Sequence, residues 1–282
     1  MDIALLGVPY ALDHQNRISH SETAARFRAA GLAERLSAIA GGAVVWTLVE
    51  PPLPEGTSQE RIAVIMRTLG EAVAATRRAG YFPLVVGGDC LSSLGVVAGL
   101  QAGKRPLGVL WFDAHGDFNT PQTTPSGFLG GMPLAMLVGR GEQALAHAAG
   151  VTQPIAEADV VLAGARDLDP LEREALESSV VTHLLDVEKL ASYPLPDVPL
   201  YVHLDVDVLD PGELGAVDYP APGGIDLETL TRALNYVMVT SEVAGLNLAC
   251  LSAAKDPDGR DLKAAIGLLE AAVGATSARQ GG

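Results

Sequence analysis

Two short motifs carry acidic and imidazole side chains at alternate positions, each directly after an apolar run. Together they contain Asp113, His115, Asp117, Asp205 and Asp207. In an extended backbone, side chains two positions apart lie on the same face, so the members of each motif face the same way. Gathered carboxylates repel one another and raise their own pKa values unless a cation lies among them. These residue types at this spacing predict a metal site rich in oxygen ligands.

Eight apolar runs of strand length, separated by helical or loop segments, are available to position these motifs. Continuous apolar strands that alternate with helices indicate a parallel sheet covered on both faces. In such sheets ligands bind beyond the carboxyl ends of the strands, which is where both motifs fall. The predicted strands are residues 3–8, 43–49, 82–86, 107–112, 160–163, 180–185, 200–204 and 243–248.

Helical spacing of apolar residues is clear in two segments. Residues 22–36 form one predicted helix, after a polar loop that follows the first strand. Residues 58–79 form a longer one, with Ser58 as its N-cap and Glu60 close behind. A further helix is expected to begin near Pro170, and capping that helix would by itself explain Asp169.

Length and composition limit the classes of protein to consider. The 282 residues suit one large α/β domain over residues 1–282, although length alone leaves two small domains open. A formal net charge of −15 argues against nucleic acid or anionic lipid as partners, because both require clustered Lys and Arg. We find no membrane span or export signal, and two cysteines outside any C-x-x-C pattern fit a reducing cytoplasm. The expected partner is a small molecule.

The motifs resemble those of the ureohydrolase family, the arginases, agmatinases and their relatives, and the resemblance covers nearly the whole chain. Residues 113–117 match the family's D-A-H-x-D and residues 205–211 match its D-x-D-x-x-D-P. Residues 87–90 stand where the family has G-G-D-H, and residues 164–172 resemble a fourth signature. Three motifs in this order and spacing are hard to obtain by chance. The resemblance implies a three-layer α/β/α sandwich on an eight-stranded parallel sheet, in agreement with the predicted strands.

The resemblance also implies a chemistry. The family uses two Mn²⁺ ions bridged by hydroxide, which attacks a guanidinium carbon and releases urea, and metals supply hydroxide by lowering the pKa of bound water. Matched by position, Asp113, His115, Asp205 and Asp207 hold one ion, and Asp113 and Asp205 also reach the second. Asp117 binds the second ion and carries a proton to the leaving amine. Ureohydrolases commonly form trimers or hexamers, so a homo-oligomer is expected.

A loop after the first motif narrows the expected substrate. It resembles the arginase version more than the agmatinase version, and in arginases the matching positions hold the head of an amino acid. Short hydroxyl and amide donors suit a carboxylate, although without the family these residues would be interpreted as loop formers beside prolines. The resemblance implies that Asn119, Thr124 and Ser126 hold the α-carboxylate and that Asp169 helps to hold the α-amino group.

Four positions depart from the family pattern. Cys90 replaces a histidine ligand of the second metal, and a thiolate favours Zn²⁺ or Fe²⁺ over Mn²⁺. Gly130 stands where arginases carry a proton-shuttling histidine, Cys250 where a glutamate pairs with the guanidinium, and Tyr219 where a threonine lines the pocket. The expected cofactor is therefore one or two Mn²⁺ ions, with Zn²⁺ or Fe²⁺ as alternatives.

Three residues keep more than one interpretation. If the alignment with the family is right, Cys90 and Cys250 face one cavity, where they would share a softer metal, form a redox-sensitive pair, or fill space as small buried hydrophobes. His203 precedes Asp205 by two positions but lies within a predicted strand, so we expect it to support or pack against the ligands rather than bind metal.

Two functions are consistent with these residues. One is a metal-dependent hydrolase that cleaves a C–N bond of arginine or a related amino acid. The other is a catalytically impaired arginase homologue that binds an amino acid or acts as an oligomer partner. Both retain the amino-acid pocket, and they differ in whether the altered metal site still supports turnover.

Overall fold

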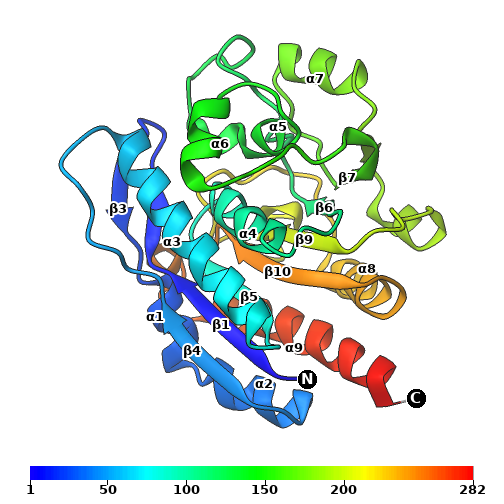
Figure 1. Ribbon diagram of the computed structural model, residues 1–282. Coiled ribbons are helices and arrows are strands. Elements are labelled where there is room, and N and C mark those ends of the chain that lie inside the picture. The colour runs from blue at the N-terminus through cyan, green and yellow to red at the C-terminus, as the bar shows by residue number, and fades with distance from the viewer. Residues whose placement is uncertain (282) are drawn as a thin grey trace.

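The eight predicted strands form a single sheet in a computed structural model, which describes the backbone of residues 1–281 and the side chains of residues 1–276 (Figure 1). The strands of this sheet are β1 (Ile3–Val8), β4 (Val44–Leu48), β5 (Phe82–Gly87), β6 (Gly108–Phe112), β7 (Val160–Ala163), β8 (Thr182–Leu184), β9 (Leu200–Asp205) and β10 (Val243–Ala249). They lie in the order β4-β1-β5-β10-β9-β6-β7-β8, and each neighbouring pair is parallel.

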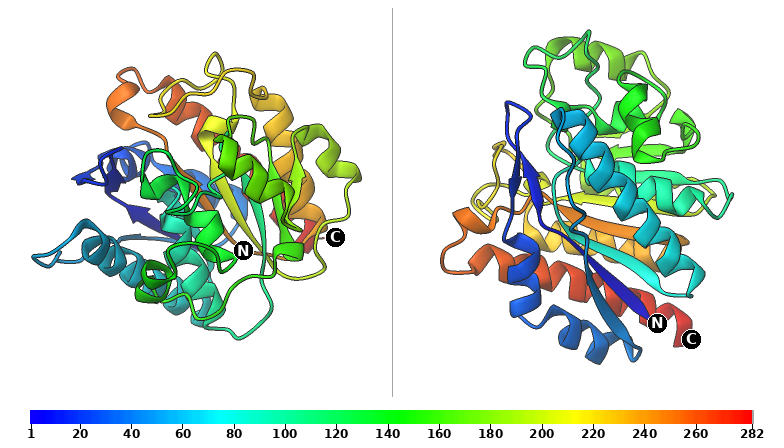
Figure 2. Two further views of the ribbon diagram at one scale, coloured as in Figure 1. Left: turned by 90° about the horizontal axis from the view of Figure 1, so that it is seen from above. Right: turned by 60° about the vertical axis from the view of Figure 1, so that its left-hand side comes forward.

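Helices cover both faces of the sheet (Figures 1 and 2). They are α1 (Thr23–Ala29), α2 (Leu32–Ala40), α3 (Ser58–Arg78), α4 (Ser92–Gln101), α5 (Pro133–Leu137), α6 (Gln143–Ala149), α7 (Pro170–Glu177), α8 (Leu227–Thr240) and α9 (Arg260–Gly281). On one face α3 packs against α4 and α6, and on the other α9 packs against α2 and α8. Two clusters of buried hydrophobic side chains fill the spaces between the layers. This is the predicted three-layer sandwich, and its covered faces explain why the strands are apolar on both sides.

None of the helices in residues 1–281 is both long enough and apolar enough to cross a bilayer.

Two predictions near the N-terminus were wrong. The helix predicted over residues 22–36 is two helices, α1 and α2, because Gly31 between them has a φ of +73° that glycine adopts without strain. The segment predicted as a polar loop after β1 contains a small antiparallel hairpin, formed by β2 (Tyr10–Leu12) and β3 (Ile18–His20). The two strands of this separate sheet have three residues each, too few to show alternation in a sequence.

The N-cap predicted for the long helix was also wrong by one residue. Thr57, not Ser58, caps α3: its hydroxyl accepts a hydrogen bond from the Glu60 N–H at 3.2 Å, and the Glu60 carboxylate accepts one from the Thr57 N–H at 2.7 Å. This reciprocal pair requires the capping residue and the glutamate to be three positions apart, which excludes Ser58.

Four neighbouring strands bring the chemically active segments to one edge of the sheet. β5 leads into Cys90, β10 into Cys250, β9 into the second acidic motif and β6 into the first. Along the chain these strands follow the order β5, β6, β9, β10, but in the sheet β10 lies between β5 and β9. The two cysteines, 160 positions apart, thereby become neighbours.

Candidate active site

The two acidic motifs meet at the carboxyl ends of β6 and β9. His115 Nδ1 lies 3.3 Å from Asp113 Oδ1 and 3.1 Å from Asp207 Oδ2. Backbone N–H groups orient the carboxylates: that of His115 donates to Asp113 (2.7 Å), that of Ala114 to Asp207 (3.0 Å) and that of Asp207 to Asp205 (2.9 Å). Asp113, His115 and Asp207 offer ligand atoms within 4.8 Å of one another. We call these three residues the His115 group.

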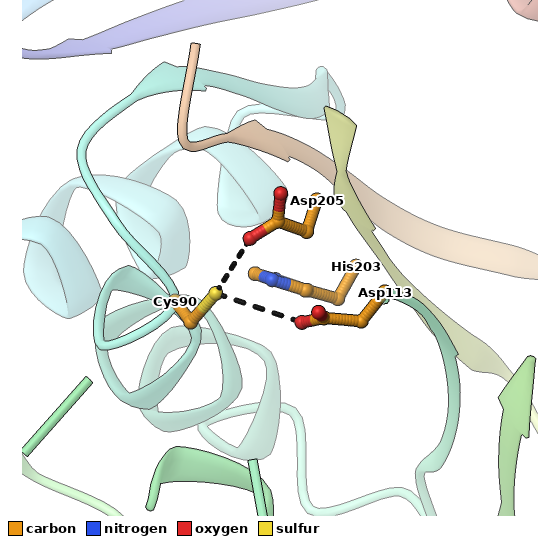
Figure 3. A group of neighbouring side chains, drawn as sticks. All are labelled: Cys90, Asp113, His203 and Asp205. Atoms are coloured by element: carbon orange, nitrogen blue, oxygen red, sulfur yellow. Dashed lines mark hydrogen bonds between the residues drawn. The ribbon is translucent and has the colours of Figure 1, made fainter. Parts of the chain in front are cut away.

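A second group of ligand atoms adjoins the first and shares Asp113 with it. It consists of Cys90, Asp113, His203 and Asp205, whose ligand atoms again lie within 4.8 Å of one another (Figure 3). The Cys90 Sγ is 3.0 Å from Asp205 Oδ2 and 3.8 Å from Asp113 Oδ2. We call these four residues the Cys90 group. The structure thus brings Cys90 to the acidic motifs, as the alignment with the family predicted.

The electrostatics of the cluster favour a bound cation. Burial, with the charge of Asp207 added, raises the pKa of Asp113 to about 6. Burial is also the main cause that raises the pKa values of Asp117 and Asp205 well above the ordinary range. Carboxyl groups in such surroundings ionise readily only when a positive charge compensates them.

The two histidines differ in charge. Burial lowers the pKa of His115, but hydrogen bonds to Asp113 and Asp207, and their charges, outweigh it and raise the pKa to about 12. Burial by itself would raise the pKa of Asp207. The hydrogen bond to His115 and the charge of that imidazole outweigh burial, so the pKa of Asp207 is lowered. Burial lowers the pKa of His203 to about 3, which keeps that imidazole neutral. His115 therefore acts as the cation of its group when no metal is bound.

Two buried polar atoms mark where a cation would fit. Asp117 Oδ2 and His203 Nε2 have no hydrogen-bond partner among the described residues. Asp117 has a left-handed backbone, with φ of +48°, which is uncommon outside glycine and gathers at functional sites. Oxygen, imidazole and thiol donors around unsatisfied buried atoms are the surroundings that divalent metals require. The residues present therefore fit a metal centre.

A cavity of about 240 Å³ opens onto the cluster. Every predicted site residue lines it except Asp113, which is only 1% exposed. The predicted site residues that line it are Cys90, His115, Asp117, Asn119, Thr124, Ser126, Gly130, Asp169, Asp205, Asp207, Tyr219 and Cys250. Acidic motifs, substrate-loop residues and departures from the family pattern thus share one pocket.

The residues predicted to hold an amino-acid head line this cavity as two hydrogen-bonded pairs. Asn119 Nδ2 donates to Asp169 Oδ2 at 2.9 Å, and the Thr124 and Ser126 hydroxyls lie 3.4 Å apart. Asp169 also precedes α7, and its N–H donates to the Glu172 carboxylate at 3.1 Å. The two interpretations of Asp169 are therefore compatible, because it begins the helix and faces the cavity.

Glu172 is a buried carboxyl group that also lines this cavity. Its Oε1 accepts the Phe118 N–H at 2.9 Å and its Oε2 accepts the Asp169 N–H. Burial nevertheless raises its pKa from the ordinary value of 4.5 to about 7. The group contributes stability that is fully present below pH 4.5 and is lost as the pH rises through about 7.

Glu172→Gln should remove this pH dependence. Between pH 4.5 and 7, the free energy of unfolding of the variant should rise relative to that of the wild type by about 3 kcal/mol, on the order of 1.4 kcal/mol for each pKa unit. Urea denaturation of both proteins across this range, without added metal, measures the difference. Contributions from carboxyl groups that are present in both proteins cancel. Two parallel stability curves would show that Glu172 does not titrate in this way.

An aromatic pair occupies the space next to Gly130. A Cβ atom at this position would meet the ring of Phe128, and that ring packs on Tyr219 with centroids 5.3 Å apart. The Phe128 ring, from the same loop, therefore fills the space that a larger side chain at position 130 would enter. Tyr219 and Phe128 both line the cavity, so the pair makes this part of the pocket more apolar.

Gly130→Ala should be less stable than Gly131→Ala by about 1 kcal/mol, the usual scale for overpacking. Gly131 is the matched control, because a Cβ atom there has nothing within 4 Å and neither glycine has a positive φ. Chemical denaturation of the two variants gives the difference, which should disappear in a Phe128→Leu background. Equal stabilities with Phe128 in place would contradict the packing described here.

Cys250 adopts a backbone conformation that is rare for its residue type. Its φ is +66°, and its N–H donates to the Gly88 carbonyl at 3.1 Å. Its Sγ lies 3.5 Å from the Cys90 Sγ, and both residues are free thiols. The alignment correctly placed the two cysteines in one cavity, although Cys250 lies outside both ligand groups found among the described residues.

Sequence reasoning missed several residues that support the cluster. Trp111 Nε1 donates to Asp113 Oδ2 at 2.9 Å, and Tyr201 Oη lies 2.9 Å from His203 Nδ1. Both residues belong to strands that the sequence presents as continuous apolar runs. A polar atom on a large side chain, two positions before Asp113 in one strand and two before His203 in the other, was the available signal.

The fold and the two ligand groups define an α/β/α protein with a buried metal-binding cluster at the edge of its sheet. A sequence model of the arginase family matches residues 1–274, and the chain belongs to that family. The family comprises hydrolases that depend on a binuclear metal centre, which agrees with the carboxylate-rich cluster described above.

Individual relatives agree with this assignment. The arginase of Bacillus caldovelox is 33% identical over 245 residues, which cover 79% of this chain and 81% of that protein. The arginase of Brevibacillus brevis is 38% identical over 169 residues, 56% of this chain and 57% of that protein. The crystal structure of arginase from Bacillus cereus superposes with a TM-score of 0.87 at 26% identity, over 97% of this chain and 99% of the other.

Proposed function

We propose that this protein is a metal-dependent hydrolase that cleaves a C–N bond of arginine or a closely related amino acid, yielding urea from a guanidinium group. The observation that supports this most directly is that the two acidic motifs line the same cavity as Asn119, Thr124, Ser126 and Asp169. A molecule bound in this cavity would thus contact both the metal-binding cluster and the donors for an amino-acid head.

The proposed roles follow the position of each side chain. By resemblance to the family, Asp113, His115, Asp205 and Asp207 would hold one ion, and Asp113, His115 and Asp207 offer ligand atoms within 4.8 Å of one another. Mn²⁺ is the natural choice for this ion because oxygen ligands predominate. Asp117 and Cys90 would serve a second ion together with the shared aspartates. A metal bound there would supply hydroxide at neutral pH by lowering the pKa of water.

The remaining residues would position the substrate. The Thr124 and Ser126 hydroxyls and the Asn119 amide present donors to an α-carboxylate, and Asp169 accepts from an α-amino group. Asp117 would carry a proton to the leaving amine at Oδ2, the buried oxygen that has no partner among the described residues. Phe128 and Tyr219 would exclude water from the other end of the cavity.

An alternative function remains tied to a specific observation. The guanidinium end contains Cys250 and the Phe128–Tyr219 pair, and neither supplies a carboxylate for a guanidinium cation. This favours a catalytically impaired homologue that retains an amino-acid pocket and acts as a binding or oligomer-partner protein.

Urea release separates the two proposals. With Mn²⁺, Zn²⁺, Fe²⁺ and Ni²⁺ tested separately, we expect turnover of arginine with at least one metal and a much lower kcat/KM for agmatine, because agmatine lacks the α-carboxylate. Turnover would contradict the impaired alternative. No urea release with any of the metals, combined with thermal stabilisation by amino acids, would contradict the hydrolase proposal.

We also propose three properties of the whole protein. The eight strands share one sheet, which supports a single domain over residues 1–282. Two free thiols 3.5 Å apart support a reducing, cytoplasmic setting. A trimer or hexamer is proposed by resemblance to the family, and light scattering of the purified protein would test it.

A further inference from the structure

The proposed function leaves the buried residue His203 without a role. It lies in β9, in register with Trp111 on β6 and with Asn247 on β10, and its side chain is fully buried. Its ring stacks on the Trp111 indole, with centroids 3.8 Å apart and planes inclined by 22°. Stacking on Trp111 accounts for the position of the ring, but an apolar ring could stack equally well, so stacking does not explain why this side chain is polar.

The two nitrogens of His203 have different surroundings. Nδ1 lies 2.9 Å from the Tyr201 hydroxyl, whereas Nε2 has no hydrogen-bond partner among the described residues. A buried polar atom without a partner costs about 1–3 kcal/mol, so a packing role alone is expensive. When Nδ1–H donates to Tyr201 Oη, Nε2 keeps a free lone pair, which is how a metal-binding histidine is held in the required tautomer.

The His203 ring faces the ligand atoms of three other residues. Figure 3 shows the ring between the Asp113 and Asp205 carboxylates, directed toward the Cys90 sulfur. One ring nitrogen and one ligand atom from each of these three residues lie within 4.8 Å of one another. Trp111 Nε1 donates to Asp113 Oδ2 at 2.9 Å and so orients a second member of the group.

We propose that His203 is a metal ligand and that it completes, with Cys90, Asp113 and Asp205, a site for a borderline-soft divalent cation such as Zn²⁺. One thiolate, one imidazole and two carboxylates are a donor set that Zn²⁺ accepts and that Mn²⁺, which prefers oxygen, binds poorly. The thiol loses its proton to solvent when the metal binds. The sequence-based expectation that His203 only supports or packs against the ligands is replaced by direct ligation.

This inference deepens the proposed function and rests on its metal centre, because both ligand groups use Asp113. The inference also changes the interpretation of Cys90, which stands where the family has a histidine. Instead of a weakened Mn²⁺ site, the Cys90 group is a rebuilt site in which the imidazole comes from β9 and the sulfur from the segment after β5. The His115 group is unchanged and keeps its oxygen-rich character.

X-ray absorption at the zinc edge tests the proposal on the full-length wild-type protein. The protein is stripped with a chelator, kept reduced with a phosphine and loaded with one equivalent of Zn²⁺. We expect sulfur and imidazole scattering in the same coordination shell. Sulfur without imidazole would place the metal at Cys90 without His203, and imidazole without sulfur would place it at the His115 group. Either of these two results would overturn the proposal.

Cobalt titration provides a second readout that does not depend on turnover. Co²⁺ should give a thiolate charge-transfer band in the wild type that one equivalent of Zn²⁺ removes. His203→Gln should bind Co²⁺ at least about 100-fold more weakly, since loss of a residue that only orients a ligand costs 10- to 100-fold. His183→Gln is the matched control, because its Nε2 already has the Ala165 carbonyl as a partner at 2.8 Å. Equal affinities for the two variants would contradict ligation by His203.

The outcomes separate this inference from the proposed function. Zinc bound through sulfur and imidazole, without urea release under any metal, would leave the inference standing and remove the hydrolase. Urea release by a protein whose zinc shell lacks either sulfur or imidazole would do the reverse. Because the absorption measurement uses the wild type, a folding defect in the His203 variant does not affect it.

Discussion

Asp205→Asn is expected to abolish the stabilisation that divalent metal gives this protein and to lower any urea-releasing activity by at least about 100-fold. Asp205 is 2% exposed and lies at the end of β9, between the Cys90 thiol and the backbone of Asp207. Removing its negative charge leaves the remaining ligands with too little charge for a divalent ion. At a metal concentration 100 times Kd, the wild type should gain about 2.7 kcal/mol, and the variant should gain almost nothing.

Without metal, Asp205→Asn should be at least as stable as the wild type. Burial raises the pKa of Asp205, so an ionised carboxylate at this position destabilises the protein when no cation is present. Asparagine retains an oxygen for the Asp207 N–H and carries no charge. In a chelator, Asp205→Asn should therefore unfold at the same temperature as the wild type or above it. A metal-free variant that is clearly less stable would indicate a structural defect and would contradict this account.

Asp258→Asn is the control for general effects of removing an aspartate. Asp258 is exposed and belongs to neither ligand group. Differential scanning calorimetry with and without Mn²⁺ or Zn²⁺ should show the same metal-induced shift for this variant as for the wild type. Loss of the shift in both variants would mean that metal acts through the overall charge of the protein and not through the cluster.

Cys90→His is expected to change the metal preference of the protein. The thiol lies 3.0 Å from Asp205 and 3.8 Å from Asp113, so a side chain at this position acts on both shared aspartates. Replacing a soft sulfur donor with imidazole should lower the ratio of Zn²⁺ to Mn²⁺ affinity by at least about tenfold. The variant should also bind a second Mn²⁺ and release urea faster in Mn²⁺ buffer.

Cys250→Ser is the matched control for this substitution. Its sulfur is 3.5 Å from that of Cys90 and faces the same cavity, but Cys250 belongs to neither ligand group. Competition titrations monitored by metal analysis should show an unchanged Zn²⁺ to Mn²⁺ ratio for Cys250→Ser. If Cys90→His gains neither a second metal nor activity, the view of Cys90 as a ligand that sets metal preference is wrong. If Cys250→Ser shifts the ratio as strongly, the two cysteines share the metal.

Much of the fold could be predicted because its strands are recognisable from short segments of the sequence. A parallel sheet covered on both faces needs apolar side chains on both sides of each strand, and such runs stand out as uninterrupted hydrophobic segments. All eight were found within two residues of their observed ends. The break at Gly31 and the cap at Thr57 were missed, because each depends on one backbone angle or one hydrogen-bond spacing that an apolar pattern does not reveal.

The sequence by itself determined the ligand motifs and the edge of the sheet to which they belong. Alternation within an extended segment predicted that Asp113 lies with His115, and Asp205 with Asp207. The first pair shares a ligand group, but the second prediction was wrong, because residues 206–208 form a 3-10 helix and Asp205 and Asp207 belong to different groups. The family resemblance added the expectation that both cysteines enter the same cavity. These inferences depend on contacts that are local, or on motifs that other chains share.

Only the tertiary structure decided which atoms meet across strands. The insertion of β10 between β5 and β9 brings the Cys90 and Cys250 sulfur atoms within 3.5 Å, and register aligns His203 with Trp111. His203 looked like a strand residue because its neighbours are apolar, whereas its role depends on what faces its free Nε2. Strand order and register are set by packing over the whole sheet, so no local pattern encodes them.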